Sequence, residues 1–361
     1  MNFFPTLCTI IGVLACFLLD AAPAYRLVDL GALEGYPVAL AKSINDEGSI
    51  VGSAILSAED RAQAILFDES GVRELGSLGG RVSLAKGINN QGAVVGRSAP
   101  EGTERAMRAF VWTQEEGMQE LPWTQGRFSS AHAINDAGMI VGAADNEKKD
   151  RHAVLWAIGQ DARDLGTLGG QYSHATAVNQ QGHVVGRSGL PNKESHAFIW
   201  SQEAGMRDLG ALEGKLSGAR GINHHGQVVG YVTNSEGKVY AFIWDEQKGM
   251  RTLDKSLPES TFSIANAINE HGAVVGMVLN KGRHRAFIWD EELGMDDLNA
   301  LVDPELHWKL YYATAINGNG EIVGVGQQGG HYRAFLLIPS PEHSHDSSEP
   351  YEQGSHGHRT E

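Results

Sequence analysis

The chain has 361 residues, of which 42% are hydrophobic, and it carries a formal net charge of −15. A chain of this length and composition can bury one large globular core. Its acidic balance argues against nucleic-acid binding, because proteins with that role usually present a basic patch to the phosphates.

Residues 1–24 are predicted to be a signal peptide. The apolar run in this segment, Leu7 to Leu19, is too short to span a bilayer, and Ala22-Pro23-Ala24 supplies small residues for cleavage before Tyr25. We therefore expect an exported protein, periplasmic or extracellular, with no membrane span after cleavage.

Both cysteines of the chain, Cys8 and Cys16, lie inside this predicted signal peptide. A mature chain beginning at Tyr25 would therefore form no disulfide and no thiolate metal site. Lipidation of Cys16 is the alternative to cleavage, although the preceding Val13-Leu14-Ala15 is a poor match to a lipidation motif.

One phrase, Ile/Val-Asn-x-x-Gly-x-Ile/Val-Val-Gly, occurs seven times after the predicted signal peptide. The steps between its asparagines are 44, 46, 44, 44, 46 and 48 residues. A period near 45 made of short strands is typical of a β-propeller. The asparagines are Asn45, Asn89, Asn135, Asn179, Asn223, Asn269 and Asn317.

The fifth repeat shows how each unit divides into strands. Alternating apolar residues separated by Gly and Asn turns predict strands over Gly218–Asn223, Gln227–Val232, Val239–Trp244 and Met250–Leu253. Helical periodicity is absent. Each repeat is therefore predicted to be a four-stranded antiparallel blade.

Small residues mark the first strand of each repeat as the innermost strand. The position three before the Ile/Val of the phrase is alanine in every repeat, so these strands can converge around an axis. The phrase's Asn and first Gly have the character of turn residues, since Asn bonds nearby backbone and Gly adopts positive φ.

Aromatic residues identify the third strand. Phe-x-Trp recurs there, as in Phe198/Trp200 and Phe242/Trp244. Residues two apart share one face of a strand, so these rings are expected to pack between neighbouring blades.

The last repeat lacks a fourth strand, and a matching segment lies at the other end of the chain. Leu27-Val28-Asp29-Leu30-Gly31 resembles Arg207-Asp208-Leu209-Gly210 of the fourth repeat. We expect the N-terminal strand to complete the last blade and close the ring, which would remove a free sheet edge. The predicted fold is an all-β, seven-bladed β-propeller over residues 25–338, followed by a disordered tail at 339–361.

The repeat resembles the HAF-repeat family of probable extracellular bacterial proteins. Ser195-His196-Ala197-Phe198-Ile199-Trp200 contains the His-Ala-Phe of the name, and Asp208-Leu209-Gly210 and Gly226-Gln227-Val228-Val229-Gly230 accompany it. The resemblance covers roughly residues 25–338 and implies export and a propeller-like repeat, but no reaction. Only the fourth repeat keeps His-Ala-Phe intact, so the histidine is not a dependable ligand position.

A polar side chain precedes the recurrent alanine of the third strand in six repeats. These residues enter their strands at the face that carries the loops between second and third strands, where a ring of donors suits polar or anionic ligands. The alternative is that they cap blade ends or pair with loop carboxylates. The predicted rim residues are Arg108, His152, His196, Tyr240, Arg285 and Arg333.

Other polar groups are interpreted as turn or tail residues. Asn45-Asp46-Glu47-Gly48 superficially resembles a calcium loop, but the matching residues Asn90-Gln91, Gln180-Gln181 and His224-His225 are not acidic and are interpreted as exposed turn tips. The scattered histidines form no chelating pattern, so no metal or cofactor is expected. The four histidines of the tail could bind a transition metal weakly, although a plain disordered tail also accounts for them.

The sequence assigns no nucleophile, base and orienting residue to one site. We therefore predict an exported, monomeric, non-catalytic binding or interaction module that uses its loop-rich face to hold a protein or glycan ligand. The alternative is an envelope or secreted enzyme, a hydrolase or lyase on polysaccharide, with its site at the mouth of the central channel. A structural surface protein is the third option.

Overall fold

In a computed structural model, residues 23–56, 59–68, 71–103, 106–123, 126–157, 161–253 and 260–341 are described. The predicted signal peptide lies outside these residues except for Pro23 and Ala24, and the predicted tail lies outside them from residue 342 onward. The described part contains strands and short 3-10 helices but no α-helix, so the all-β prediction is confirmed.

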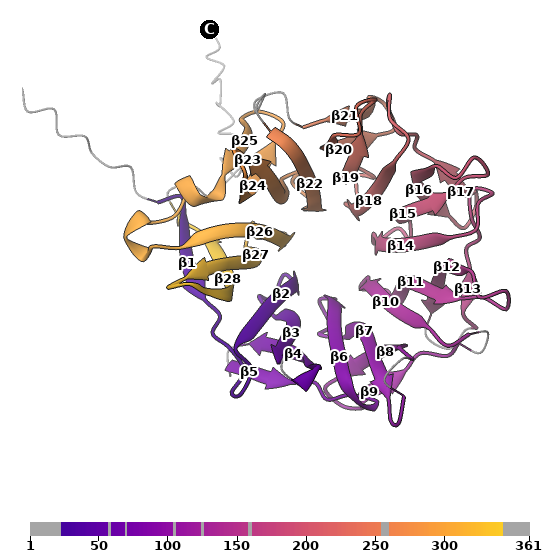
Figure 1. Cartoon of the computed structure of the whole chain (residues 1–361), viewed down its shortest axis with the longest axis horizontal. Helices are drawn as coiled ribbons and strands as arrows, with labels where there is room; N and C mark the ends of the chain where they lie inside the picture. The colour runs from indigo at the N-terminus through magenta and orange to yellow at the C-terminus, as the bar shows by residue number, and fades with distance from the viewer. Residues whose placement is uncertain are drawn as a thin grey trace, which may run out of the picture.

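The strands form four-stranded antiparallel groups, called blades here, arranged around a central axis (Figure 1). Three blades are separate sheets, and the others join in pairs into two eight-stranded sheets through single parallel pairings. In the described part, the first and last strands of a sheet are not hydrogen-bonded to each other, so each sheet is open. Each blade is named below by its innermost strand.

The innermost strands point toward the axis in Figure 1 and are β2 (Val38–Ile44), β6 (Gly79–Ile88), β10 (Ser129–Ile134), β14 (Ser173–Val178), β18 (Ser217–Ile222), β22 (Ser260–Ile268) and β26 (Lys309–Ile316). The second strands are β3 (Ile50–Leu56), β7 (Val94–Pro100), β11 (Met139–Asp145), β15 (Val184–Gly189), β19 (Val228–Thr233), β23 (Val274–Asn280) and β27 (Ile322–Gln328).

The third strands are β4 (Arg61–Asp68), β8 (Arg108–Thr113), β12 (Arg151–Ala157), β16 (Ser195–Ser201), β20 (Val239–Asp245), β24 (Arg283–Asp290) and β28 (His331–Pro339). The outer strands are β5 (Gly71–Glu74), β9 (Gly117–Glu120), β13 (Arg163–Asp164), β17 (Gly205–Asp208), β21 (Gly249–Thr252), β25 (Gly294–Asp297) and β1 (Tyr25–Asp29). The 3-10 helices η3 (Leu298–Ala300) and η4 (Pro304–Leu306) precede β26.

The N-terminal strand β1 pairs antiparallel with β28, so it supplies the fourth strand of the β26 blade. Leu27 lies opposite Leu337 in this register, and Tyr25 and Leu27 pack against the core between the last two blades. Hydrogen bonds continue past the predicted domain boundary, because Ser340 donates its amide to the carbonyl of Ala24.

The hydrophobic core lies between blades, as the Phe-x-Trp pattern predicts. Phe242 and Trp244 of β20 pack against Val185 and Ala197 of the preceding blade. Arginines of the outer strands extend the packing, since Arg207 stacks on Trp244 and Arg251 on Trp289 of the next blade, with guanidinium-to-ring distances of 5.4 and 5.9 Å. Each blade therefore needs its neighbour to bury its aromatic face.

The seven recurrent asparagines have a role beyond their own turns. Each one is buried, and its Oδ1 accepts a hydrogen bond from the backbone amide four residues later, as in Ala93 to Asn89 at 2.9 Å. Each Nδ2 donates to the backbone carbonyl of the next repeat's asparagine. The last donor, Asn317, reaches the carbonyl of Asn45 at 3.0 Å, so the hydrogen bonds run in an unbroken cycle.

We expect Asn89→Ala to lower the free energy of unfolding by about 1–3 kcal/mol, because it leaves the Ala93 amide without its partner and removes the donor from the next blade to the Asn135 carbonyl, which keeps only the Gly138 amide. Chemical denaturation measures this change. Asn90→Ala is the matched control, since Asn90 is the next residue and is exposed. Equal losses in the two variants would contradict a role for the asparagine cycle.

Candidate functional site

Every innermost strand carries a β-bulge directly after its recurrent alanine. The register shifts between Ala41 and Ser43 of β2, and at the same point of the other six strands. A bulge re-aims the side chain of the extra residue. The second glycine of the repeated phrase faces this bulge. A Cβ on Gly52 would lie 1.9 Å from the carbonyl oxygen of Leu40.

The bulge residues line the central channel, and all of them are polar. They contribute to two cavities along the axis, and six of the seven line both cavities. We call these seven residues the axial ring: Lys42, Lys86, His132, Thr176, Arg220, Asn266 and Thr314.

Four members of the axial ring hold blades together. Each bonds to the carbonyl of the next blade's recurrent alanine: His132 to Ala175 (2.7 Å), Thr176 to Ala219 (2.9 Å), Asn266 to Ala313 (2.8 Å) and Thr314 to Ala41 (3.0 Å). A short side chain with a hydrogen-bond donor is therefore sufficient for the structural role at this position.

The other three members, Lys42, Lys86 and Arg220, make no such bond among the described residues. Lys86 Nζ donates instead to Ser130 Oγ at 2.9 Å, and Arg220 Nη1 to Asn266 Oδ1 at 3.1 Å. The carbonyls of Ala85, Ala131 and Ala265 consequently lack the side-chain donor that the other blades receive. Long cationic side chains have replaced the structural donor in these three blades.

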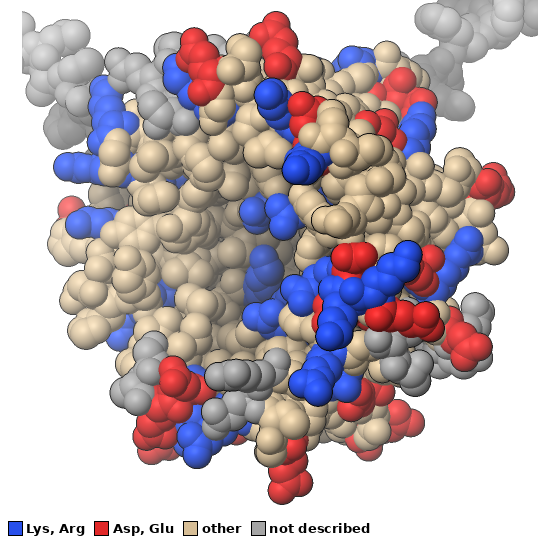
Figure 2. Space-filling model, turned by 45° about the vertical axis from the view of Figure 1, so that its right-hand side comes forward, with Lys and Arg blue, Asp and Glu red and all other residues tan. Residues whose placement is uncertain are grey.

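The cavity nearer the loop-rich face has a volume of about 380 Å³ and contains no carboxylate in its lining. Lys42, Lys86, Arg187, Arg220 and His132 line it, with Tyr231 beside Arg220 at 5.6 Å. Lys and Arg side chains gather in the hollow at the centre of the face shown in Figure 2, whereas acidic side chains lie around the periphery.

Acidic groups of the channel are confined to its other end. The second cavity, about 310 Å³, reaches the turns between first and second strands, and Asp46, Asp136 and Glu270 stand there. The channel is thus polarised, with cations toward the loop-rich face and carboxylates toward the turn face.

The cations of the channel perturb one another. Desolvation inside the channel, followed by the charges of Arg97 and Lys42, lowers the pKa of Lys86 to about 7. Desolvation, then Arg187, Arg151 and Lys86, lowers the pKa of His174 to about 4. The pKa of His132 is held well below its usual value by burial and then by Lys86, so its ring is neutral at pH 7 and Nδ1–H donates to Ala175.

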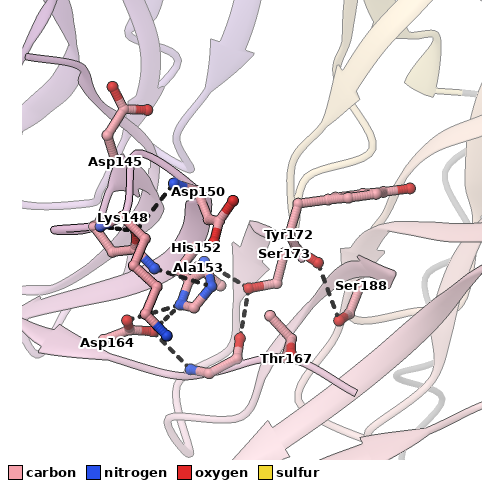
Figure 3. Close-up of polar contacts among 12 residues, drawn as sticks. Asp145, Lys148, Asp150, His152, Ala153, Asp164, Thr167, Tyr172, Ser173 and Ser188 are labelled. Carbon is pink, nitrogen blue, oxygen red and sulfur yellow. Dashed lines mark hydrogen bonds and ion pairs between the residues drawn. The ribbon is translucent and has the colours of Figure 1, made fainter. Parts of the chain in front are cut away.

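The six predicted rim residues lie on the third strands, away from the axial ring, and five of them pair with acidic residues of the outer strands. His152 bonds Asp164 at 2.8 Å, and Figure 3 shows its ring turned toward this carboxylate. The other pairs are His196 with Asp208, Arg108 with Glu120, Arg285 with Asp297, and Arg333 with Asp29.

Tyr240 is the exception, because Thr252 occupies the place of the acidic residue on its outer strand. The hydrogen bond to Asp164, followed by its charge, raises the pKa of His152. The structure thus distributes these side chains over separate blades, five of them with a local acidic partner, and does not gather them into one cluster.

Sequence reasoning missed the axial ring. The sequence did contain a sign of it. The residue after each recurrent alanine is polar, although it lies in a strand that was predicted to be innermost. Among the described residues no group of three or more His, Cys, Asp or Glu side chains could hold a metal ion. No helix in the described part is long and apolar enough to cross a membrane.

Comparison with solved structures identifies the fold as that of β-propellers. The propeller domain of the Trilobed protease from Pyrococcus furiosus aligns with a TM-score of 0.53 and 11% identity, over 84% of this chain and 94% of that domain. A lectin from Burkholderia pseudomallei aligns with a TM-score of 0.50 and 6% identity, over 89% and 96%.

A puromycin-hydrolyzing peptidase from Mycobacterium tuberculosis aligns with a TM-score of 0.56 and 13% identity. It covers 89% of this chain, which spans only 55% of the peptidase. Residues 169–334 match a family described as "Protein of unknown function (DUF3466)". No curated protein matches the chain. Identities this low establish the shared fold alone.

Proposed function

We propose that this protein is an exported, non-catalytic binding module that holds an anionic ligand in the axial channel. The observation that carries the proposal is the cavity of about 380 Å³ whose lining includes four Lys or Arg side chains and no carboxylate, in a chain of net charge −15. None of Lys42, Lys86, Arg187 and Arg220 has a carboxylate within 4.0 Å among the described residues. An anion would supply the missing counter-charge.

The proposed scaffold is a closed, seven-bladed propeller. The asparagine cycle from Asn45 through Asn317 and back supports the closed count, and the pairing of β1 with β28 supports closure through the last blade. The ring of innermost strands places Lys42, Lys86 and Arg220 around one cavity. In the sequence, each of these residues is at least 44 positions from the next.

Export is the second part of the proposal. Support comes from the sequence of residues 1–24 and from the resemblance to the HAF-repeat family, and the mature chain is proposed to act in the periplasm or outside the cell as a monomer. The channel cations line a small cavity, which favours a small ligand or a protruding anionic group of a glycan or protein over nucleic acid.

The alternative function is an envelope or secreted hydrolase or lyase acting at the same channel. The pKa of Lys86 near neutrality favours this alternative, because a lysine that is partly neutral at pH 7 can accept a proton. Release of product from an acidic polysaccharide by the natural chain, abolished by Lys86→Gln, would establish this activity in place of simple binding.

Isothermal titration of the full chain with citrate, at pH 7 and low salt, tests the proposal against neutral sucrose. We expect saturable citrate binding that Arg220→Gln weakens by about tenfold, since a charge-assisted hydrogen bond is worth about 1.5–3 kcal/mol. Arg207→Gln is the control, because Arg207 pairs with Glu246 at the periphery.

Two outcomes would overturn the channel proposal. One is the absence of binding by citrate and by the other small anions described below. The other is a loss of binding in Arg285→Gln that Arg220→Gln does not show, which would move the ligand to the predicted rim.

A further inference from the structure

One negative charge cannot balance the four Lys and Arg side chains that line the channel cavity. Lys42, Lys86, Arg187 and Arg220 line a single cavity, and Arg97 acts on Lys86 from β7. The carboxylates of the channel, Asp46, Asp136 and Glu270, line only the second cavity at the turn end. A ligand with a single charge would leave most of the mutual repulsion in place.

Lys86 lies among these positively charged side chains. It lies on β6 between Lys42 of β2 and His132 of β10, with Arg97 on the adjacent strand β7 and His174 on β14. Its amine has one hydrogen-bond acceptor among the described residues, the hydroxyl of Ser130. The charges that act on this ammonium are those of Arg97 and Lys42, although Lys86 also lines the second cavity with Asp46, Asp136 and Glu270. A half-buried ammonium with one neutral acceptor and two cations acting on it is poorly stabilised.

We infer that the channel takes ligands carrying two or more negative charges, and that Lys86 takes up a proton when such a ligand binds. The inference rests on the proposed anion-binding function and specifies its ligand class. Carboxylate, phosphate and sulfate groups share the required chemistry, because each offers charged oxygen acceptors to Lys and Arg.

The direction of the pH dependence follows from the Lys86 pKa of about 7. At pH 8 the amine is mostly neutral in the free protein, and a nearby polyanion raises its pKa toward the ordinary lysine value, so binding takes up close to one proton. Affinity therefore falls as pH rises above 7, by up to about tenfold per pH unit. At pH 6 Lys86 is already charged, and His132 and His174 become the groups that can gain protons.

Titration calorimetry of the full chain with ethane-1,2-disulfonate and with methanesulfonate isolates the effect of the second charge. Neither probe titrates near pH 8, so any proton uptake belongs to the protein. We expect the disulfonate to bind at least about tenfold more tightly. Repeating the titration at pH 8 in buffers of different ionisation enthalpy gives the number of protons taken up, expected to be close to one.

The variant Lys86→Arg keeps the positive charge at this position but removes the group that titrates near pH 7. Arginine keeps its proton throughout this range, so the variant should bind the disulfonate at pH 8 at least as tightly while its proton uptake falls toward zero. Lys238→Arg is the matched control, since Lys238 is exposed and pairs with Glu236, and it should retain the uptake of the natural chain.

Equal binding of the two sulfonates, or unchanged proton uptake in Lys86→Arg, would overturn the inference while leaving anion binding intact. Failure of every anion to bind would instead overturn the proposed function. Parallel titrations at pH 8 with succinate against acetate, and with methyl phosphate (a dianion) against dimethyl phosphate (a monoanion), identify whether carboxylates or phosphates are preferred. A preference for the more highly charged member within each pair supports the inference, and no preference within either pair contradicts it.

Discussion

A variant with Lys42, Lys86 and Arg220 all replaced by threonine is expected to melt at a higher temperature than the natural chain while losing its anion binding. Threonine is the natural residue at the equivalent positions 176 and 314, where its hydroxyl donates to the next blade's alanine carbonyl. The substitutions should provide the same donor for the carbonyls of Ala85, Ala131 and Ala265. They also remove the repulsion among the three cations.

The expected gain is a few kcal/mol, since each added hydrogen bond contributes about 0.5–1.5 kcal/mol. The lost contacts of Lys86 with Ser130 and of Arg220 with Asn266 offset part of it. The melting temperature of a domain this large should therefore rise by several degrees. Thermal melts at pH 7 and low salt measure the gain, and citrate titration measures the loss of binding.

Methionine at the same three positions is the control for charge alone. Methionine removes the cations without adding a donor, so this variant should lose binding with a smaller gain in stability. A lower melting temperature for the threonine variant would mean that the cations stabilise the blades, which contradicts their assignment to a ligand. Opposite effects on stability and binding would identify the three side chains as functional.

Removal of the N-terminal strand has the largest expected effect on stability. Deleting residues 25–30 takes away β1, exposes the edge of β28, and uncovers the core that Tyr25 and Leu27 help to fill. Burying a large apolar side chain contributes about 1.5–3 kcal/mol, and the ladder of hydrogen bonds to β28 is lost as well. We expect a loss of roughly 5 kcal/mol, with aggregation through the exposed edge.

Thermal melts and gel filtration of the deletion variant test this prediction. Leu27→Asp and Arg26→Asp form a matched pair, because Leu27 is partly buried against the core whereas Arg26, one residue earlier, is exposed. Only Leu27→Asp should destabilise the chain strongly. An unchanged melting temperature and a single monomeric peak after deletion of residues 25–30 would contradict closure by β1.

The rim residues show how strand pairing supplies local partners that a repeated pattern alone does not reveal. Sequence placed His196 at the entry of a third strand, where the structure has it. Its partner Asp208 lies 12 residues later, on the strand that pairs with β16, and the same interval separates His152 from Asp164 and Arg285 from Asp297. Strand pairing, which the four-strand interpretation already contained, brings each pair together.

Local sequence determined much of the fold. Alternation and Gly/Asn turns fixed the four strands of each repeat, the recurrent alanine identified the innermost strand, and Phe-x-Trp identified the faces that pack between blades, because each of these properties depends on residues close together in the chain. The match of Leu27-Val28-Asp29-Leu30 to other outer strands predicted the pairing of β1 with β28.

Only the tertiary structure decided where the candidate site lies. Lys42, Lys86 and Arg220 are far apart in the sequence, and each is one variable residue after an alanine. The arrangement of blades around an axis brings their strands together, and the bulge turns each side chain into the channel. Their lowered pKa values and the absence of a side-chain donor to three of the alanine carbonyls depend on how neighbouring blades meet, so no single repeat contains them.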